Sequence, residues 1–318
     1  MSSYRNQLPQ LNGETLLTDG GLESTLFFQD GFELPEYSAY LLLDDDEGVQ
    51  HLTDYFRRFL AIADRFSLGF LLESVTWRAN QDWAERIGYS SSQLDSVNQR
   101  AIEMLLQLRQ ENEKAGCPIV VSGCLGPRGD GYVVGSMMTS EQAAEYHEPQ
   151  IRSLASGGTD MVTAMTLTYA EEAIGIALAG QSARVPVAIS FTVETDGRLP
   201  SGQPLGEAIE QIDQETGSAP AYYMINCAHP THFGPTLTGA SDWRSRIGGL
   251  RANASKLSHE ELDGSEELDS GNPEEFGQEH RQLLDSLDHN ISVLGGCCGT
   301  DHRHIEALCQ SVFASRLD

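Results

Sequence analysis

Residues 186–191 read Pro-Val-Ala-Ile-Ser-Phe, and residues 291–296 read Ile-Ser-Val-Leu-Gly-Gly. Both are nearly unbroken apolar runs, without the polar and apolar alternation of a strand that has one face in water. Strands that are buried on both faces read in this way, which is typical of parallel sheets covered by helices. These two stretches therefore predict an α/β protein built on a parallel sheet.

Similar β-rich segments recur along the chain, and we expect strands at residues 15–18, 69–74, 118–123, 161–164, 185–191, 221–226, 247–250 and 291–294. Apolar residues and helix-start signals predict helices between them, including residues 49–63, 101–108, 141–154 and 274–287. The last of these is opened by the start signal Asn272-Pro273-Glu274-Glu275. Eight strands alternating with helices in roughly 300 residues match a (β/α)8 TIM barrel. A doubly wound open sheet is the alternative, but no Gly-x-Gly-x-x-Gly follows the first strand. We therefore expect residues 1–318 to form a single (β/α)8 barrel domain.

The chain is strongly acidic, with 20 Lys and Arg against 47 Asp and Glu and a formal net charge of −27. Such a surface repels nucleic-acid phosphates and anionic lipids, so we expect neither nucleic acid nor a membrane as a partner. The acidity is attributed to solubility. Acidic and small residues gather at 259–277, and this segment is interpreted as a solvated loop.

The cysteines indicate a reducing environment. Six cysteines in 318 residues do not form a disulfide framework, and two of them, Cys297 and Cys298, are adjacent. The N-terminus lacks the apolar run of a signal peptide, and no segment reaches the roughly 18 apolar residues needed to span a bilayer. We therefore expect a cytoplasmic protein in which free thiols persist. The oligomeric state is left open.

Chemistry in a parallel barrel is located where the strands end. Asp19 follows the first expected strand, Cys227 follows the sixth, and the pair Cys297 and Cys298 follows the eighth. Three thiolates that converge there suit Zn²⁺, and three protein ligands leave a fourth position open, as in catalytic zinc sites. A substrate thiol in that position becomes a thiolate at neutral pH, which is then able to displace an activated methyl group in line. These residues predict a catalytic zinc but do not name the substrate.

Other residues near these strand ends have simpler explanations. Cys117, Cys124 and Cys309 are interpreted as buried structural thiols, although Cys124 is also a candidate to line the site. His229 and His232 follow Cys227 and are weaker ligand candidates, because three sulfurs already suffice. Residues 125–131 are expected to form a mobile loop over the substrate. The rings of Trp77, Tyr132 and Tyr169 either face a cationic methyl donor or pack in the core or rim.

The sequence resembles the homocysteine S-methyltransferase family, which includes betaine- and S-methylmethionine-dependent enzymes. The resemblance covers nearly the whole chain, and its most specific part is an upstream Asn-Cys paired with Gly-Gly-Cys-Cys. The matching motifs are Thr18-Asp19-Gly20-Gly21, Leu125-Gly126-Pro127, Pro186–Thr192, Ile225-Asn226-Cys227-Ala228-His229-Pro230 and Gly295-Gly296-Cys297-Cys298-Gly299-Thr300. The resemblance implies a barrel, Zn²⁺ on the three cysteines, and a role for Asp19 in orienting the thiol substrate.

One departure from the family pattern concerns the amino group of the substrate. Family members that act on homocysteine usually carry Phe-Glu-Thr after the fourth strand, and the Glu helps to bind that amine; here the stretch reads Ala164-Met165-Thr166. A buried ammonium without a counter-charge is costly, so homocysteine is expected to bind poorly unless Glu73 or Glu194 compensates. Trp77 also stands where many members carry Tyr.

The leading hypothesis is a zinc-dependent S-methyltransferase that moves a methyl group from a small onium donor to a thiol such as homocysteine, giving methionine. S-methylmethionine, S-adenosylmethionine and a betaine-like compound are the candidate donors. The rival hypotheses are a methyltransferase or demethylase for another thiol or methylated compound, and a catalytically silent zinc-binding barrel. The predicted substrate-binding residues are Asp19, Glu73, Trp77, Met165 and Asn226.

Overall fold

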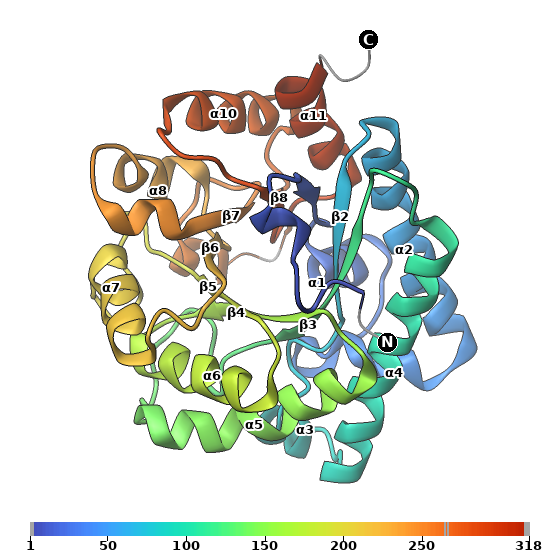
Figure 1. Cartoon of the computed structure of the whole chain (residues 1–318). Coiled ribbons are helices and arrows are strands. Elements are labelled where there is room, and N and C mark those ends of the chain that lie inside the picture. Colours follow the sequence, from blue (N-terminus) through green and yellow to red (C-terminus); the bar gives the residue numbers. More distant parts are fainter. Residues whose placement is uncertain (1–2, 264, 266, 315–318) are drawn as a thin grey trace.

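The computed structural model describes residues 3–263, 265 and 267–314 and contains a closed barrel of eight parallel strands in sequence order, with β8 paired to β1 (Figure 1). The strands are β1 (Leu16–Leu17), β2 (Gly69–Glu73), β3 (Ile119–Leu125), β4 (Met161–Leu167), β5 (Val187–Phe191), β6 (Tyr222–Asn226), β7 (Ile247–Ala252) and β8 (Val293–Gly296). Each overlaps one of the eight predicted segments. The (β/α)8 prediction is confirmed, and the open-sheet alternative is wrong because β8 closes on β1.

Helices surround the barrel on all sides in Figure 1. The longer ones are α2 (Asp46–Arg65), α4 (Ser91–Asn112), α5 (Ser140–Gly157), α6 (Ala170–Ala183), α7 (Leu205–Thr216), α8 (Pro230–Leu237), α10 (Pro273–Ser286) and α11 (His302–Phe313). Shorter segments are α1 (Leu22–Ser24), α3 (Gln81–Arg86), α9 (His259–Asp263), η1 (Pro9–Leu11), η2 (Thr25–Gln29), η3 (Pro35–Tyr37), η4 (Ala39–Asp44) and η5 (Asp242–Arg246). The four predicted helices correspond to α2, α4, α5 and α10.

Local sequence signals explain where several helices begin. Ser90 and Thr139 form capping boxes with Gln93 and Gln142 at the starts of α4 and α5. Asn272 accepts hydrogen bonds from the first backbone amides of α10, as the Asn-Pro start signal indicated. None of the described helices is long and apolar enough to cross a membrane.

The segment 259–277 is more structured than the predicted solvated loop. It contains α9 and the first residues of α10, while residues 264 and 266 lie outside the described part of the chain. Ser258 and Glu261 exchange hydrogen bonds between side chain and backbone and so cap α9. His259 turns inward instead of facing solvent, with only 11% of its side chain exposed. The acidic and polar composition of the segment had predicted a solvated loop, so the inward position of His259 was not expected.

The buried apolar side chains form two clusters. One lies between the strands and the helices, and the other contains residues such as Leu16, Leu71, Val120 and Met224, with Leu8 among them. Polar and charged side chains are buried instead at the carboxyl ends of the strands, including Asp19, Glu73 and Asn226. Function is therefore expected at that end of the barrel.

Candidate functional site

Three cysteines meet at the mouth of the barrel. The Sγ atoms of Cys227, Cys297 and Cys298 lie within 4.8 Å of one another, and among the described residues this is the one group of three or more His, Cys, Asp or Glu side chains arranged to hold a metal. Cys227 and Cys297 are joined as a disulfide, and Sγ of Cys298 lies 3.9 Å from Sγ of Cys227. The sequence prediction that these residues converge is confirmed.

The backbone explains how three sulfurs from two strands converge. Cys227 follows the last residue of β6 and has a positive φ of 53°, so its side chain leaves the alternation of the strand. Cys297 and Cys298 follow Gly296, the last residue of β8. A side chain at Gly295 or Gly296 would collide with Thr18 or Thr300, so only glycine lets the eighth strand pack so tightly below the cysteines.

The donor set fits Zn²⁺. Thiolate sulfur is the ligand type that zinc prefers, and three such ligands leave one coordination position for a substrate. Burial raises the pKa of the Cys298 thiol, so without a cation this side chain is held as the neutral thiol. A bound dication would reverse that preference. Once the Cys227–Cys297 disulfide is reduced, the three sulfurs, which lie within 4.8 Å of one another, are suited to hold a metal.

Two side chains reach the sulfur atoms from outside the cluster. Nδ2 of Asn226 lies 3.9 Å from Sγ of Cys297, and the hydroxyl of Tyr132 lies 3.6 Å from Sγ of Cys298. The amide of Asn226 also accepts hydrogen bonds from Ser190 and from the backbone of Thr166, and donates to the Thr166 hydroxyl. Asn226 therefore fixes the end of β4 beside Cys297. Its predicted contact with substrate stays a prediction.

The loop between β3 and α5 contains residues 125–131 and reaches the cysteines through Tyr132; that it is mobile and folds over a bound substrate stays a prediction. It is anchored at several points: Arg78 donates to the carbonyl of Gly129, Glu172 accepts from the amide of Arg128, and Tyr132 reaches Cys298. The Tyr132 ring also packs on the ring of His259, with 4.7 Å between centroids. Through Tyr132 the loop therefore contacts both Cys298 and His259.

His259 is a site residue that sequence reasoning missed. Its Nε2 lies 2.7 Å from the carbonyl oxygen of Cys227 and 3.3 Å from the hydroxyl of Thr192. Its Nδ1 lies 3.6 Å from the carboxylate of Glu194. Nothing in the acidic segment around it distinguishes this histidine from a solvated one.

A buried charge network lies at the strand ends beside the cysteines. The guanidinium of Arg251 in β7 donates to the carboxylates of Asp19, at 2.7 Å, and Glu73. The hydroxyl of Tyr55 donates to the other oxygen of Asp19 at 3.0 Å. Burial raises the pKa of both Asp19 and Glu73, against the opposing effect of Arg251. Sequence reasoning found the two carboxylates but missed Arg251, although one arginine in an apolar strand is itself an indication.

Trp77 and Met165 lie together at the rim. Nε1 of Trp77 donates to the backbone carbonyl of Met165 at 3.4 Å, and the guanidinium of Arg78 lies 3.9 Å from the centre of the indole ring. Met165 is only 6% exposed. The structure thus brings these two predicted residues into contact, and their roles toward substrate stay predictions.

The weaker ligand candidates lie apart from the metal cluster. His229 bonds to Thr231 through Nδ1 and pairs with Glu279 through Nε2, and His232 contacts the carbonyl of Lys256. Neither belongs to the sulfur cluster. Cys124 is buried at the end of β3. Burial and the nearby charge of Glu73 raise the pKa of its thiol, against the opposing effect of Arg251.

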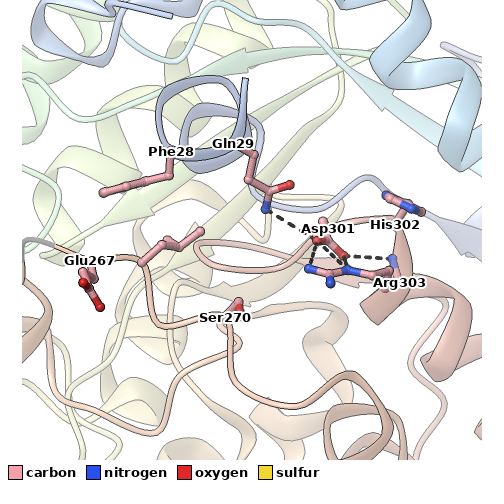
Figure 2. Close-up of a pocket in the computed structure, with 8 residues that line it drawn as sticks. Phe28, Gln29, Glu267, Ser270, Asp301, His302 and Arg303 are labelled. Atoms are coloured by element: carbon pink, nitrogen blue, oxygen red, sulfur yellow. Dashed lines mark hydrogen bonds and ion pairs between the residues drawn. The ribbon is translucent and has the colours of Figure 1, made fainter. Parts of the chain in front are cut away.

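A separate hollow of about 700 Å³ opens beside the loop 297–300, which carries Cys297 and Cys298 and is called the metal loop below (Figure 2). It is lined by Phe28 and Gln29 of η2, by segment 267–270 and by the start of α11. Asp301 at its wall bonds to Arg303 at 2.6 Å and to Gln29 at 3.5 Å. None of the predicted site residues lines this hollow.

The chain is similar in sequence to known methyltransferases. The pattern of the family described as homocysteine S-methyltransferase matches residues 16–312. The selenocysteine Se-methyltransferase of Brassica oleracea var. italica is 25% identical and aligns over 99% of this chain and 93% of its own length. Betaine–homocysteine S-methyltransferase 1 of Bos taurus is 24% identical over 97% of this chain and 75% of its own.

A solved structure shares the fold. The homocysteine methyltransferase MmuM of Escherichia coli, in its metallated form, superposes with a TM-score of 0.70 at 19% identity. The match covers 95% of this chain and 98% of that one. The barrel architecture is therefore shared from end to end.

Proposed function

Because the chain belongs to the homocysteine S-methyltransferase family and is a methyltransferase, we propose that it moves a methyl group from a small onium donor to a thiol, with Zn²⁺ on Cys227, Cys297 and Cys298. The observation that carries the proposal is the convergence of these three sulfurs at the carboxyl end of a closed parallel barrel. Homocysteine is the proposed acceptor, and methionine is the product.

The chemistry needs a thiolate at neutral pH. Zn²⁺ bound to the three cysteines supplies a Lewis acid that lowers the pKa of the acceptor thiol. The acceptor sulfur then attacks the methyl carbon, the carbon–onium bond breaks, and the bonding electrons leave with the neutral donor. The thiol proton passes to solvent. This balance needs no redox partner.

The protein's own residues hold the reactants. Asn226 and Tyr132 steady Cys297 and Cys298 by polar contacts to their sulfurs, which keeps the ligand geometry fixed. Asp19, fixed by Tyr55 and Arg251, offers a carboxylate beside the acceptor. The exposed parts of the Trp77 and Tyr132 rings are suited to the cationic donor, because an aromatic face attracts an onium group.

The donor is the least defined part of the proposal. Two of the relatives are a betaine–homocysteine and a selenocysteine methyltransferase, so donors and acceptors vary among similar barrels. We expect S-methylmethionine, S-adenosylmethionine or a betaine-like compound. A reducing, cytoplasmic location belongs to the same proposal, since three clustered thiolates are oxidised easily.

A second candidate function is methyl transfer to or from another thiol or methylated compound. Met165 favours it, because an apolar side chain stands where relatives that bind homocysteine carry a carboxylate. A catalytically silent zinc-binding barrel is the alternative that an assay must exclude.

The test is a product assay. Zinc-loaded protein is incubated with homocysteine and each donor in turn, with cysteine and selenocysteine as other acceptors, and methylated products are identified by mass spectrometry. We expect methionine from homocysteine, and at least 100-fold less from Cys298→Ser. Products from another acceptor alone would favour the second function, and no product from any pair would favour the silent barrel.

A further inference from the structure

The mouth of the barrel holds more negative than positive charge. Asp19 and Glu73 share a single guanidinium, that of Arg251, and all three side chains are almost fully buried. Oε1 of Glu73 is buried without a hydrogen-bond partner. An unbalanced buried carboxylate is costly unless a cation completes it. The site is therefore built to receive a small cation.

Glu23 adds a third carboxylate at this mouth. It lies in α1, directly after the Asp19-Gly20-Gly21 turn. Two hydrogen bonds fix α1 against the metal loop: Gly21 donates to the carbonyl of Thr300 at 3.0 Å, and Gly299 donates to the hydroxyl of Ser24 at 3.2 Å. The position of Glu23 is thus set by the same loop that carries Cys297 and Cys298.

The side chain of Glu23 is half-buried, within electrostatic reach of the groups of the site. Its charge acts on residues from several strand ends and from the covering loop: Asp19, Tyr55, Cys124, Tyr132 and Cys298. No Arg, Lys or His among the described residues lies within 4.0 Å of its carboxylate. Arg78, whose charge also reaches Glu23, is held between the indoles of Trp77 and Trp83.

Glu73 and Glu194, the two carboxylates that the sequence suggested for this role, each already lie beside a basic side chain. Glu73 is paired with Arg251 at the floor of the mouth, and Glu194 lies beside His259 at the outer edge. Burial raises the pKa of Glu23 to about 7, which shows how little stabilisation its negative charge receives from the protein alone.

A positive group that binds to Glu23 should keep its charge throughout the reaction. A donor's onium charge disappears in the transition state, so a carboxylate against it would stabilise the reactant more than the transition state. The ammonium of an amino-acid thiol keeps its charge throughout, and a carboxylate holds it without raising the barrier. Aromatic faces suit the donor, and a carboxylate suits the acceptor.

We propose that Glu23 binds the α-ammonium group of an amino-acid thiol and so replaces the carboxylate that is missing at Met165. The inference rests on the proposed function and adds to it the residue that selects an acceptor with an α-ammonium group over an uncharged thiol. Glu23 acts as a specificity residue, separate from the metal ligands.

The test compares two thiols that differ only in the amine. L-homocysteine and 4-mercaptobutanoate are titrated by calorimetry into zinc-loaded wild type and Glu23→Gln under reducing conditions. We expect Glu23→Gln to weaken homocysteine about 10- to 100-fold, because a charged hydrogen bond is lost, and to change 4-mercaptobutanoate less than about threefold. Glu33→Gln, an exposed carboxylate ten residues away, is the control and should change neither. Zinc content and melting temperature confirm that each variant is folded.

A rescue variant separates recognition from structure. Adding Met165→Glu to Glu23→Gln should recover part of the homocysteine affinity, which a merely structural defect at Glu23 would not allow. Equal effects on both thiols, or none, would overturn the inference while leaving the proposed function intact. Weaker binding of betaine with unchanged homocysteine would assign Glu23 to the donor and also overturn it. If neither thiol binds the wild type, the proposed function itself fails.

Discussion

The guanidinium of Arg251 lies 2.7 Å from the carboxylate of Asp19, although 232 positions separate them in the sequence. The same guanidinium donates to the carbonyls of Gly20 and Gly296, so it joins the ends of β1, β7 and β8. Asp19 is the proposed orienting carboxylate, and Gly296 directly precedes the metal loop. This arginine therefore holds the substrate side and the metal side of the mouth in one arrangement.

Replacing Arg251 should destabilise the protein. Arg251→Met would leave Asp19 and Glu73 buried without a counter-charge, which costs about 3–5 kcal/mol in the free energy of unfolding. Urea denaturation at pH 8 is the measurement. Arg58→Met removes an exposed arginine from α2 and should cost less than about 0.5 kcal/mol. Equal losses in the two variants would contradict the proposed importance of the buried network.

The loss in Arg251→Met should also depend on pH. Burial already raises the pKa of Asp19 and Glu73, and removing the guanidinium raises both further. A carboxyl group with a raised folded-state pKa binds protons in the folded state first, so its contribution to stability grows as pH falls. The deficit of the variant should therefore shrink between pH 8 and pH 5. A deficit that grows on acidification would contradict this account.

Tyr132 should matter for function more than for folding. Tyr132→Phe keeps the ring on His259 but removes the hydroxyl near the Cys298 sulfur. Removing such an outer contact to a metal ligand costs about 10- to 100-fold in metal affinity or activity. Zinc competition with a chromophoric chelator measures the first and product formation the second. Tyr37→Phe, on an exposed ring, is the control. No change in either quantity would remove Tyr132 from the site.

The barrel and the convergence of Cys227, Cys297 and Cys298 were predictable from sequence because local signals carry them. Doubly buried strands read as unbroken apolar runs, and strand ends fall where those runs stop. The Asn-Cys and Gly-Gly-Cys-Cys motifs therefore mark positions on one face of the barrel. Caps such as Asn272 also gave a helix boundary correctly.

The rest of the site depends on contacts that no local pattern encodes. Arg251 meets Asp19 only because the barrel closes, and His259 turns inward from a segment whose composition suggests a solvated loop. Glu23 looks like an ordinary first-turn acid until the metal loop fixes α1 over the mouth. Pairings between distant strand ends are set by tertiary packing, so sequence periodicity cannot reveal them.

Removal of zinc should make the cluster oxidise. All three sulfurs lie within 4.8 Å of one another, so a thiolate released from the metal has a neighbour in reach. Chelation in air should inactivate the enzyme and yield a disulfide within the trio, and reductant with zinc should restore activity. Mapping by mass spectrometry identifies the pair. Three free thiols after chelation and air exposure would be evidence against the clustering.

Each cluster cysteine should be needed for metal retention. Cys227→Ser, Cys297→Ser and Cys298→Ser should each lose most of the zinc, because a hydroxyl is a poor substitute for thiolate. Cys117→Ser, at a partly exposed cysteine outside the cluster, is the control and should keep it. Elemental analysis of reduced, desalted protein gives the zinc content per chain. Full retention in all three cluster variants would contradict the ligand assignment.

The most direct test of the central claim is the sulfur count around the metal before and after acceptor is added. X-ray absorption at the zinc edge measures it on the loaded protein in solution. The account predicts three sulfur ligands and one lighter atom in the free enzyme, and four sulfurs once homocysteine is bound. Fewer than three sulfurs in the free enzyme, or a count that homocysteine leaves unchanged, would contradict it.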